Sequence, residues 1–427
     1  MKVAVVLFTR DLRVHDHPAL AASVRAAEHV VPLFVHDPSL PAGSNRRTFL
    51  DGCLSDLASS LRQRGGDLVT LRGDPVDCAL RVAKQVGAAG IAMSADVSGF
   101  ARARSQRLAA ACAAEGVAFR EFPGVTIAEP GSLRPGGGGS HYKVFTPYYR
   151  AWQASSLREV HGAPRRISLP EDMPKSWFAT GDPDAVSGES AARERLSSWL
   201  THLESYGDHH DDLAADRTSR LSPYLHFGCL SPRELVARVD GHAGAEPFVR
   251  QLCWRDFYHQ VLSAFPDLRR RPYRPGAEDS WRDEPDALEA WKAGHTGVPI
   301  VDAGMRQMLQ EGWMHNRARL ITASYLTKHL YLDWRAGGDH FYDLLLDGDV
   351  ANNYGNWQWV AGTGNDTKPY RRFNPLRQAE RFDPTGDYVR RYVPELADIP
   401  GKAIHEPWKQ PASTRRGYPS PLALDAK

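Results

Sequence analysis

Short apolar runs alternate with amphipathic stretches through the first third of the chain. The apolar runs have the length of buried strands, and we predict strands at residues 3–8, 29–35, 67–71, 90–93 and 118–122. The stretches between them repeat apolar residues at helical spacing, and we predict helices at residues 46–64, 75–86 and 101–115. This alternation predicts a Rossmann-like α/β domain with a parallel sheet. The region carries no G-x-G-x-x-G and no Walker A motif, so neither nucleotide fingerprint is predicted.

The pattern changes twice further along the chain. Residues 129–195 are interrupted by proline and glycine, including a glycine-rich turn at 135–140, and they predict an interdomain linker. From residue 196 on, long helical patterns dominate and strand signals nearly vanish. We therefore predict an α/β N-terminal domain at 1–128, a linker at 129–195 and an all-α C-terminal domain at 196–427.

Composition narrows the choice of partner and compartment. Lysine and arginine number 53 against 51 acidic residues, so a nucleic-acid partner would need a local basic patch. The five cysteines are scattered without a C-x-x-C pair, which disfavours a disulfide framework or a zinc site and favours a reducing compartment. The apolar start is too short for a signal peptide, and no run approaches the ~18 apolar residues of a membrane helix. We expect a soluble, cytoplasmic protein that does not engage a membrane.

Two segments of the C-terminal half suit phosphate and base contacts. Residues 218–228 place hydroxyls before a helical stretch, which fits either a phosphate near a helix start or ordinary helix caps. In the second segment, Gln251, Trp254, Arg255 and Tyr258 are spaced to share one helix face. A face of amide, indole, guanidinium and phenol favours a base-stacking site, with a half-buried structural face as the alternative.

Two further segments concentrate polar and aromatic residues. At 312–319, Asn316 and Arg319 share a face, Arg317 points elsewhere toward a possible phosphate, and His315 lacks a second ligand at zinc-like spacing. We therefore expect a structural or hydrogen-bonding histidine and no metal. Residues 347–359 hold two acids, three asparagines and two tryptophans. A calcium loop is the alternative, but the EF-hand spacing and its terminal Glu are missing.

These segments carry a resemblance to a known family. Trp313-x-His315-Asn316-Arg317-x-Arg319, followed by Asp347-Gly348-Asp349, Asn352-Asn353 and Trp357-x-Trp359, resembles the DNA photolyase/cryptochrome family. The likeness covers the whole chain, including residues 8–13, 142–147 and 373–375, and lies closest to the class I cyclobutane pyrimidine dimer photolyases. It implies a monomeric deoxyribodipyrimidine photolyase, in which light-driven electron transfer from reduced FAD splits a dimer flipped out of DNA.

The resemblance also implies roles for individual residues. FAD is expected to contact Tyr206, Thr218, Ser219, Arg220, Leu221, Ser222, Arg255, Arg319, Asp347, Gly348, Asp349 and Asn353. Asp347 is expected to pair with Arg319. Asn353 would face flavin N5, where plant cryptochromes place Asp. Because an amide cannot supply a proton as a carboxylic acid can, Asn353 favours the fully reduced, anionic flavin.

Electron transfer, DNA contacts and a second chromophore follow from the same resemblance. The predicted electron-transfer chain is Trp357, Trp334 and Trp281. The predicted lesion and DNA contacts are Gln251, Trp254, Tyr258, Asn316, Arg317, Leu320, Trp359, Arg371 and Arg372, with 269–271 as further basic residues. Arg46 and Asp96 match antenna-contacting positions, and they favour a deazaflavin over methenyltetrahydrofolate. Asp96 follows a predicted strand, where open α/β sheets bind ligands.

Some positions depart from the family pattern and keep alternatives open. Gln251 replaces the Glu, and Leu320 the Met, of well-known bacterial dimer photolyases. These changes keep a cryptochrome-type blue-light photoreceptor as the alternative function. The (6-4) class is disfavoured because Met314-His315-Asn316 lacks its paired histidines, and the end at Lys427 without a long tail disfavours plant-type cryptochromes. A DNA-binding flavoprotein with a merely structural flavin is disfavoured by the three tryptophans.

Overall fold

The computed structural model describes residues 2–40, 43–177 and 186–423. Residues 178–185 of the predicted linker lie outside this described part. The chain divides into two compact units: a first unit of Met1–Glu204 with Ser219–Pro266, and a second of Ser205–Thr218 with Asp267–Lys427. This division by compactness does not follow the boundaries at 128 and 195, which remain a prediction from sequence.

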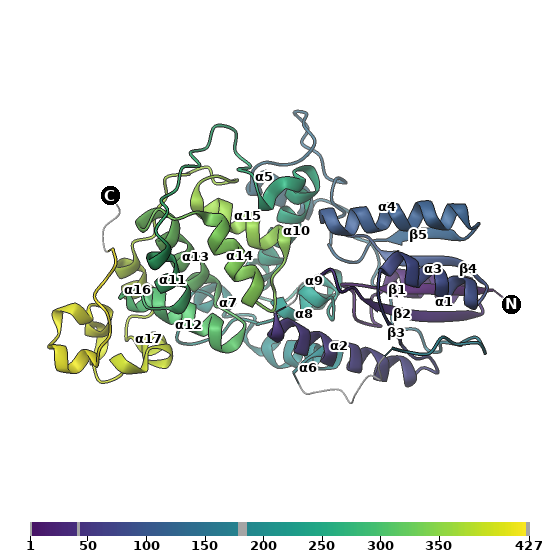
Figure 1. Cartoon of the computed structure of the whole chain (residues 1–427), viewed down its shortest axis with the longest axis horizontal. Coiled ribbons are helices and arrows are strands. Elements are labelled where there is room, and N and C mark those ends of the chain that lie inside the picture. Colours follow the sequence, from purple (N-terminus) through teal and green to yellow (C-terminus); the bar gives the residue numbers. More distant parts are fainter. Residues whose placement is uncertain (1, 41–42, 178–185, 424–427) are drawn as a thin grey trace. The chain divides into compact units, whose positions relative to one another are not determined.

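A five-stranded parallel sheet forms the centre of the α/β part of the first unit. The strands are β1 (Val3–Phe8), β2 (His29–His36), β3 (Val69–Arg72), β4 (Ala88–Ser94) and β5 (Ala118–Phe122), in the order β3-β2-β1-β4-β5. The helices along this sheet are α1 (Pro18–Ala26), α2 (Ser44–Arg62), α3 (Pro75–Gln85) and α4 (Gly99–Ala114) (Figure 1). Strands β1, β2 and β4 are largely buried, which explains their nearly continuous apolar sequence. The predicted α/β fold is confirmed.

Helices make up the rest of the first unit. They are α5 (Phe145–Gln153), α6 (Gly188–Trp199), α8 (Ser222–Phe227), α9 (Pro232–Val239) and α10 (Ala245–Ala264), with a 3₁₀ turn at Leu200–His202. Helix α5 and most of α6 lie within the stretch predicted as a linker. Four aromatic side chains of α5 are buried, so this part of the stretch packs as part of the unit.

The described residues of the second unit form helices and loops, with no strand beyond an isolated bridge between Arg282 and Leu332. Its helices are α7 (Tyr206–His209), α11 (Pro285–Ala293), α12 (Pro299–Glu311), α13 (Asn316–Ser324), α14 (Trp334–Leu344), α15 (Val350–Ala361), α16 (Pro375–Phe382) and α17 (Asp387–Tyr392). Helix α13 continues into a π-helical turn at Tyr325–His329. Side chains of His315, Asp333, Asp349 and Asn374 cap α13, α14, α15 and α16. The predicted all-α character of the C-terminal part is confirmed.

The loop after β1 is fixed by buried charges. The fully buried guanidinium of Arg13 donates to four backbone carbonyls, and His17 pairs with the carboxylate of Asp11 at 2.9 Å. Arg158 binds the carboxylate of Asp16 with both terminal nitrogens, at 2.5 and 2.7 Å. Burial alone would raise the pKa of Asp11 and Asp16, but these partners outweigh it and lower both pKa values to about 2.

These two carboxylates predict a loss of stability in acid. A carboxylate with a lowered pKa stabilises the fold above its unfolded value near 3.8, and this contribution disappears as the pH falls from about 4 through 2. Each carboxylate is expected to contribute about 2 kcal/mol. Urea unfolding between pH 7 and pH 2.5 measures the effect. Arg158→Gln should lower the free energy of unfolding at pH 7, and the gap between variant and wild type should be smaller at pH 2.5. An equal gap in the free energy of unfolding at both pH values would contradict the role of Asp16.

None of the helices in the described part of the chain combines the length and apolar character needed to cross a bilayer.

Candidate active site

The start of α15 gathers two carboxylates of the second unit. Arg319 donates from its two terminal nitrogens to Asp347 at 3.1 and 2.8 Å, and its Nε donates to the carbonyl of Met314 at 2.8 Å. The Asp347 side chain is only 5% exposed, so the guanidinium compensates a nearly buried charge. Asp349 caps α15 by accepting the backbone N–H and the side-chain N–H of Asn352 at 2.8 and 2.9 Å. The predicted pairing of Arg319 with Asp347 is present.

Asn353 follows one turn into α15. Its Nδ2 donates to the carbonyl of Gly338 on α14 at 2.8 Å, which fixes the orientation of the amide. Gly348, between the two acids, is buried and leaves no side chain there. The expected position of Asn353 opposite flavin N5 remains a prediction.

The three predicted electron-transfer tryptophans belong to the second unit. Trp334 and Trp357 are 0% and 3% exposed. Gly337 lets α14 and α15 approach closely, because a Cβ there would lie 2.3 Å from the Trp357 ring. Trp281 and Trp334 both donate their indole N–H to one oxygen of Asp279, at 2.9 and 3.4 Å. The structure therefore links Trp281 to Trp334 through a shared carboxylate.

Two residues that contact the predicted tryptophans were missed in the sequence. Asp279 also receives the guanidinium of Arg335 at 2.6 Å, and it is two residues from Trp281 but 55 from Trp334. Trp291 is fully buried and meets the ring of Trp357 edge to face at 5.9 Å. No spacing in the sequence distinguishes either residue.

The residues of the predicted polar face of α10, in the first unit, differ in how far they are exposed to solvent. Gln251 is exposed and Trp254 partly exposed, as a substrate contact requires. Tyr258 is only 1% exposed and packs against Trp254 and Phe257, so its contact with DNA stays a prediction. Arg255 donates to the carbonyl of Val125 at 2.5 Å, so part of its hydrogen-bonding capacity serves the fold.

The hydroxyl-rich segment before α8 does not cap that helix. No side chain caps α8, although the hydroxyl of Ser219 accepts the backbone N–H of Leu221, the residue before the helix, at 3.4 Å. In the second unit, the Oγ1 of Thr218 is buried and has no hydrogen-bond partner among the described residues. A buried hydroxyl without a partner is costly, and it fits a polar group such as a phosphate. Tyr206 in the same unit is 8% exposed.

The matching residues of the first unit also show local constraint. Arg220 adopts a left-handed backbone conformation with φ of 52°, and the carbonyl of Ser219 accepts from Arg195 at 2.8 Å. Leu221 is buried, whereas Ser222 is partly exposed. These features hold the segment in one shape; contact with FAD remains a prediction for all four residues.

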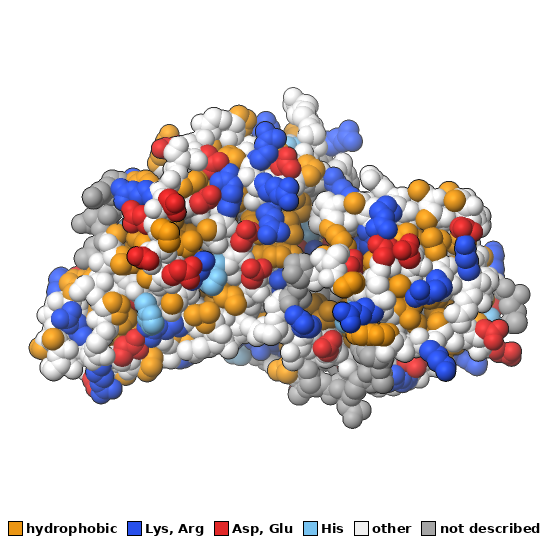
Figure 2. Space-filling view, viewed as in Figure 1, with side chains coloured by type: hydrophobic (Ala, Val, Ile, Leu, Met, Phe, Trp, Pro, Cys, Tyr) orange, Lys and Arg blue, Asp and Glu red, His pale blue; other side chains and the backbone are white. Residues whose placement is uncertain are grey.

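Three basic residues of the predicted DNA face, Arg317, Arg371 and Arg372, have polar or charged partners within the second unit. Arg317 forms a two-pronged ion pair with Asp211 at 3.1 and 2.5 Å, and its contact with a phosphate stays a prediction. Arg371 lies 3.6 Å from Asp366, and Arg372 donates to a tyrosine hydroxyl at 3.1 Å. Figure 2 shows basic and acidic side chains interspersed over much of the visible face.

The remaining predicted lesion contacts of the second unit differ in exposure. Asn316 is exposed, and Leu320 and Trp359 are partly exposed. The guanidinium of Arg371 lies 4.8 Å from the centre of the Trp359 ring, and Phe373 stacks near the same ring at 6.3 Å. His315 accepts the backbone N–H of Arg317 at 3.1 Å, which confirms the prediction of a hydrogen-bonding histidine. The described residues contain no group of three His, Cys, Asp or Glu that could hold a metal.

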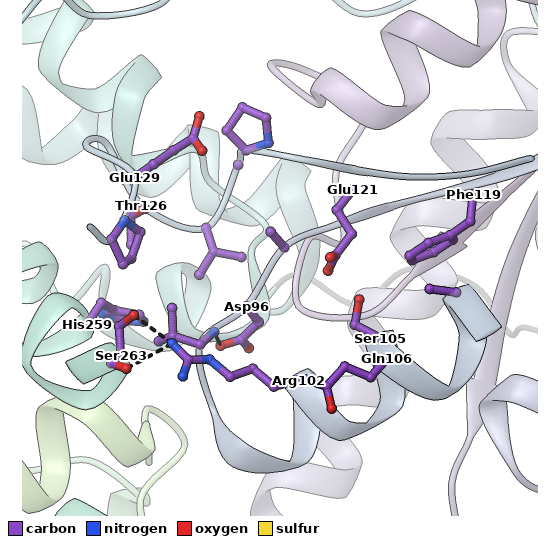
Figure 3. Close-up of a pocket in the computed structure, with 17 residues that line it drawn as sticks. Asp96, Arg102, Ser105, Gln106, Phe119, Glu121, Thr126, Glu129, His259 and Ser263 are labelled. Carbon is purple, nitrogen blue, oxygen red and sulfur yellow. Dashed lines mark hydrogen bonds between the residues drawn. The ribbon is translucent and has the colours of Figure 1, made fainter. Parts of the chain in front are cut away.

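A hollow of about 380 Å³ opens in the first unit beside α4, β5 and α10 (Figure 3). Arg102 reaches across from α4 and donates to the hydroxyl and carbonyl of Ser263 on α10, at 2.6 and 3.0 Å. Asp96 lines this hollow just after β4, and it accepts from Arg10 at 3.2 Å. Arg46, the other predicted antenna residue, is 6% exposed and is not part of the lining.

The chain is similar to known proteins over nearly its whole length. Residues 4–168 match the family described as DNA photolyase, and residues 248–426 match the FAD binding domain of DNA photolyase. The deoxyribodipyrimidine photo-lyase of Streptomyces griseus is 50% identical, covering 99% of this chain and 96% of that protein. The enzyme of the same name from Escherichia coli is 36% identical over 99% and 96%.

Two solved structures share the fold. A bacterial class III photolyase from Agrobacterium tumefaciens has a TM-score of 0.93 and 35% identity, covering 99% of this chain and 94% of its own. A Synechocystis cryptochrome has a TM-score of 0.89 and 28% identity, covering 99% and 96%.

Proposed function

This chain belongs to the DNA photolyase family, and we propose that it is a light-driven enzyme that splits cyclobutane pyrimidine dimers in DNA. The observation that carries the proposal is that one helical unit contains both the Arg319–Asp347 pair and the buried tryptophans. A relative named for this activity, at 50% identity, supports it. We propose further that it works as a cytoplasmic monomer.

The chain's own groups fit an FAD molecule. Asp347 and Asp349 supply acceptors for the N–H and O–H groups of the flavin ring and ribityl chain, and Arg319 holds the Asp347 carboxylate in place through two hydrogen bonds. The unpartnered hydroxyl of Thr218 offers a donor to a phosphate. Asn353 keeps a neutral amide beside the ring and therefore offers it no acidic proton. When bound and reduced, FAD supplies the electron that light releases to the dimer.

Lesion recognition is proposed to rest on stacking and amide contacts. Trp254 and Trp359 are both partly exposed, as rings that stack on unpaired bases must be. Gln251 and Asn316 are exposed and carry both donors and acceptors, which suit the carbonyl and N–H edges of thymine. Because these amides do not titrate near neutral pH, this part of recognition should not depend on pH.

A repair assay tests the proposal. Purified protein reduced with dithionite is mixed with an oligonucleotide that carries one thymine dimer, and intact thymines are counted after blue light or darkness. We expect repair in light only. Full flavin loading with binding of the dimer but no repair would contradict the enzyme and favour the cryptochrome-type photoreceptor, which the likeness to the Synechocystis structure keeps as the second candidate.

Two finer assignments accompany this function. We propose a class I enzyme, although the class III structure from Agrobacterium tumefaciens is also a close match. We also propose a deazaflavin antenna near Asp96, supported by a hollow of the 300–1,000 Å³ typical of ligand sites. Reconstitution with deazaflavin and with methenyltetrahydrofolate, followed by repair action spectra, tests the antenna. Uptake of folate alone would reverse the choice, and unchanged deazaflavin binding by Asp96→Ala would remove that residue from the site.

A further inference from the structure

The indole of Trp254 belongs to a stack of rings inside the first unit. The centres of the Trp254 and Phe145 rings are 3.6 Å apart, and the two planes differ by only 4°. Tyr149, one turn further along α5, stacks near Phe145 at 5.7 Å and 13°. The guanidinium of Arg250 lies 5.1 Å from the centre of Phe145 and 4.9 Å from that of Tyr149. We call Trp254, Phe145, Tyr149 and Arg250 the aromatic column.

Hydrogen bonds from side chains of α10 hold α5 and the segment before it in a fixed position against α10. The buried carboxylate of Asp256 accepts the indole N–H of Trp152 at 3.0 Å. Gln260 exchanges two hydrogen bonds with the backbone of Tyr142, at 3.1 and 2.8 Å. These contacts join α10 to residues on both sides of Phe145 in sequence, so Phe145 is presented to Trp254 on a rigid support.

The stack leaves Trp254 with one orientation. Phe145 is 5% exposed, whereas Trp254 is partly exposed, so Phe145 covers one indole face from within the unit. An unsupported indole turns about two side-chain bonds, and binding would have to immobilise it. We propose that Phe145 is a positioning residue that holds the Trp254 indole flat, ready to stack on a base of the DNA substrate. This inference rests on the proposed function, which makes Trp254 a wall of the lesion site.

The test separates binding from catalysis in FAD-loaded protein. The dissociation constant for dimer-containing DNA is measured in the dark, and the repair rate at saturating DNA is measured in light after reduction. We expect Phe145→Leu to raise the dissociation constant roughly three- to tenfold, the factor that corresponds to the loss of one aromatic stack, with little change in the saturated rate. Phe145→Tyr keeps the ring and should bind as wild type does.

A matched variant separates positioning from general loosening. Tyr148 lies on the same helix, is 2% exposed and contacts the rings of Phe257 and Tyr142. Tyr148→Leu should lower the melting temperature at least as much as Phe145→Leu while leaving DNA affinity unchanged. If Phe145→Leu does not fold, Phe145→Met replaces it, because methionine preserves most of the volume without a planar face.

Each result decides the matter. Unchanged affinity in a flavin-loaded Phe145 variant overturns the inference, and so does an equal loss of affinity in Tyr148→Leu. Wild-type protein that binds the dimer without repairing it would contradict the repair function alone, since the ratio of dissociation constants still reports on Phe145. Wild-type protein with no preference for dimer-containing DNA would overturn both.

Discussion

Replacing Trp334 by phenylalanine is expected to abolish light-driven reduction of the oxidised enzyme, while repair by chemically reduced enzyme stays near the wild-type rate. Trp334 is fully buried and shares the carboxylate of Asp279 with Trp281. Phenylalanine fills most of the same space, but its ring is much harder to oxidise than an indole. An electron lost by Trp357 can then no longer be replaced through Trp334.

The measurement is the loss of oxidised-flavin absorbance under blue light with an external thiol present. Trp291→Phe is the matched control, because Trp291 is equally buried and touches Trp357 but lies outside the proposed line. Trp291→Phe should keep photoreduction. Normal photoreduction in Trp334→Phe, or its loss only in Trp291→Phe, would place the electron path elsewhere.

The carboxylate of Asp279 allows a second test of the proposed electron path. Asp279 accepts hydrogen bonds from the indoles of Trp281 and Trp334, and its negative charge stabilises a positively charged, oxidised indole beside it. Burial raises the pKa of Asp279, but its bonds to Arg335 and Trp281 outweigh this and lower it, so the carboxylate is ionised at neutral pH. Asp279→Asn should therefore slow photoreduction without abolishing it.

The parallel sheet could be predicted because strands β1, β2 and β4 are largely buried and their sequences are nearly continuously apolar. Helix α1 was missed because it is nine residues long and is capped by His17, an uncommon cap. Helix α5 was missed because neighbouring prolines and glycines made its surroundings read as a linker, although four of its aromatic side chains are buried.

Contacts with residues distant in sequence limit how well the site can be predicted from the sequence. The motif spacing indicated Arg317 as a phosphate contact, but Asp211, 106 residues earlier, already pairs with it. Likewise, Tyr258 shares the helical spacing of Trp254 yet is buried, because packing from other segments decides which part of α10 remains open. Periodicity identifies a helix face; it does not identify what covers that face.

Replacing Arg319 by glutamine is expected to release FAD and to destabilise the protein by about 3 kcal/mol, since breaking a buried ion pair leaves an uncompensated charge. The Asp347 side chain is 5% exposed and has both oxygens on Arg319, so no bulk water can replace the lost guanidinium fully. The flavin-to-protein absorbance ratio and urea unfolding measure the two effects. Arg306→Gln is the matched control in the same unit, because Arg306 forms a similarly sheltered pair with Glu395 at 2.8 Å. It should destabilise the protein without lowering flavin content.

The double variant Arg319→Gln/Asp347→Asn then separates folding from cofactor binding. Removing the stranded carboxylate should recover much of the lost stability, because two neutral amides can share a hydrogen bond where one charge stood alone. Flavin content should stay low, because the proposed acceptor for the flavin has lost its charge. Full recovery of both stability and flavin in the double variant would show that the pair serves only the fold and that FAD is held by other residues.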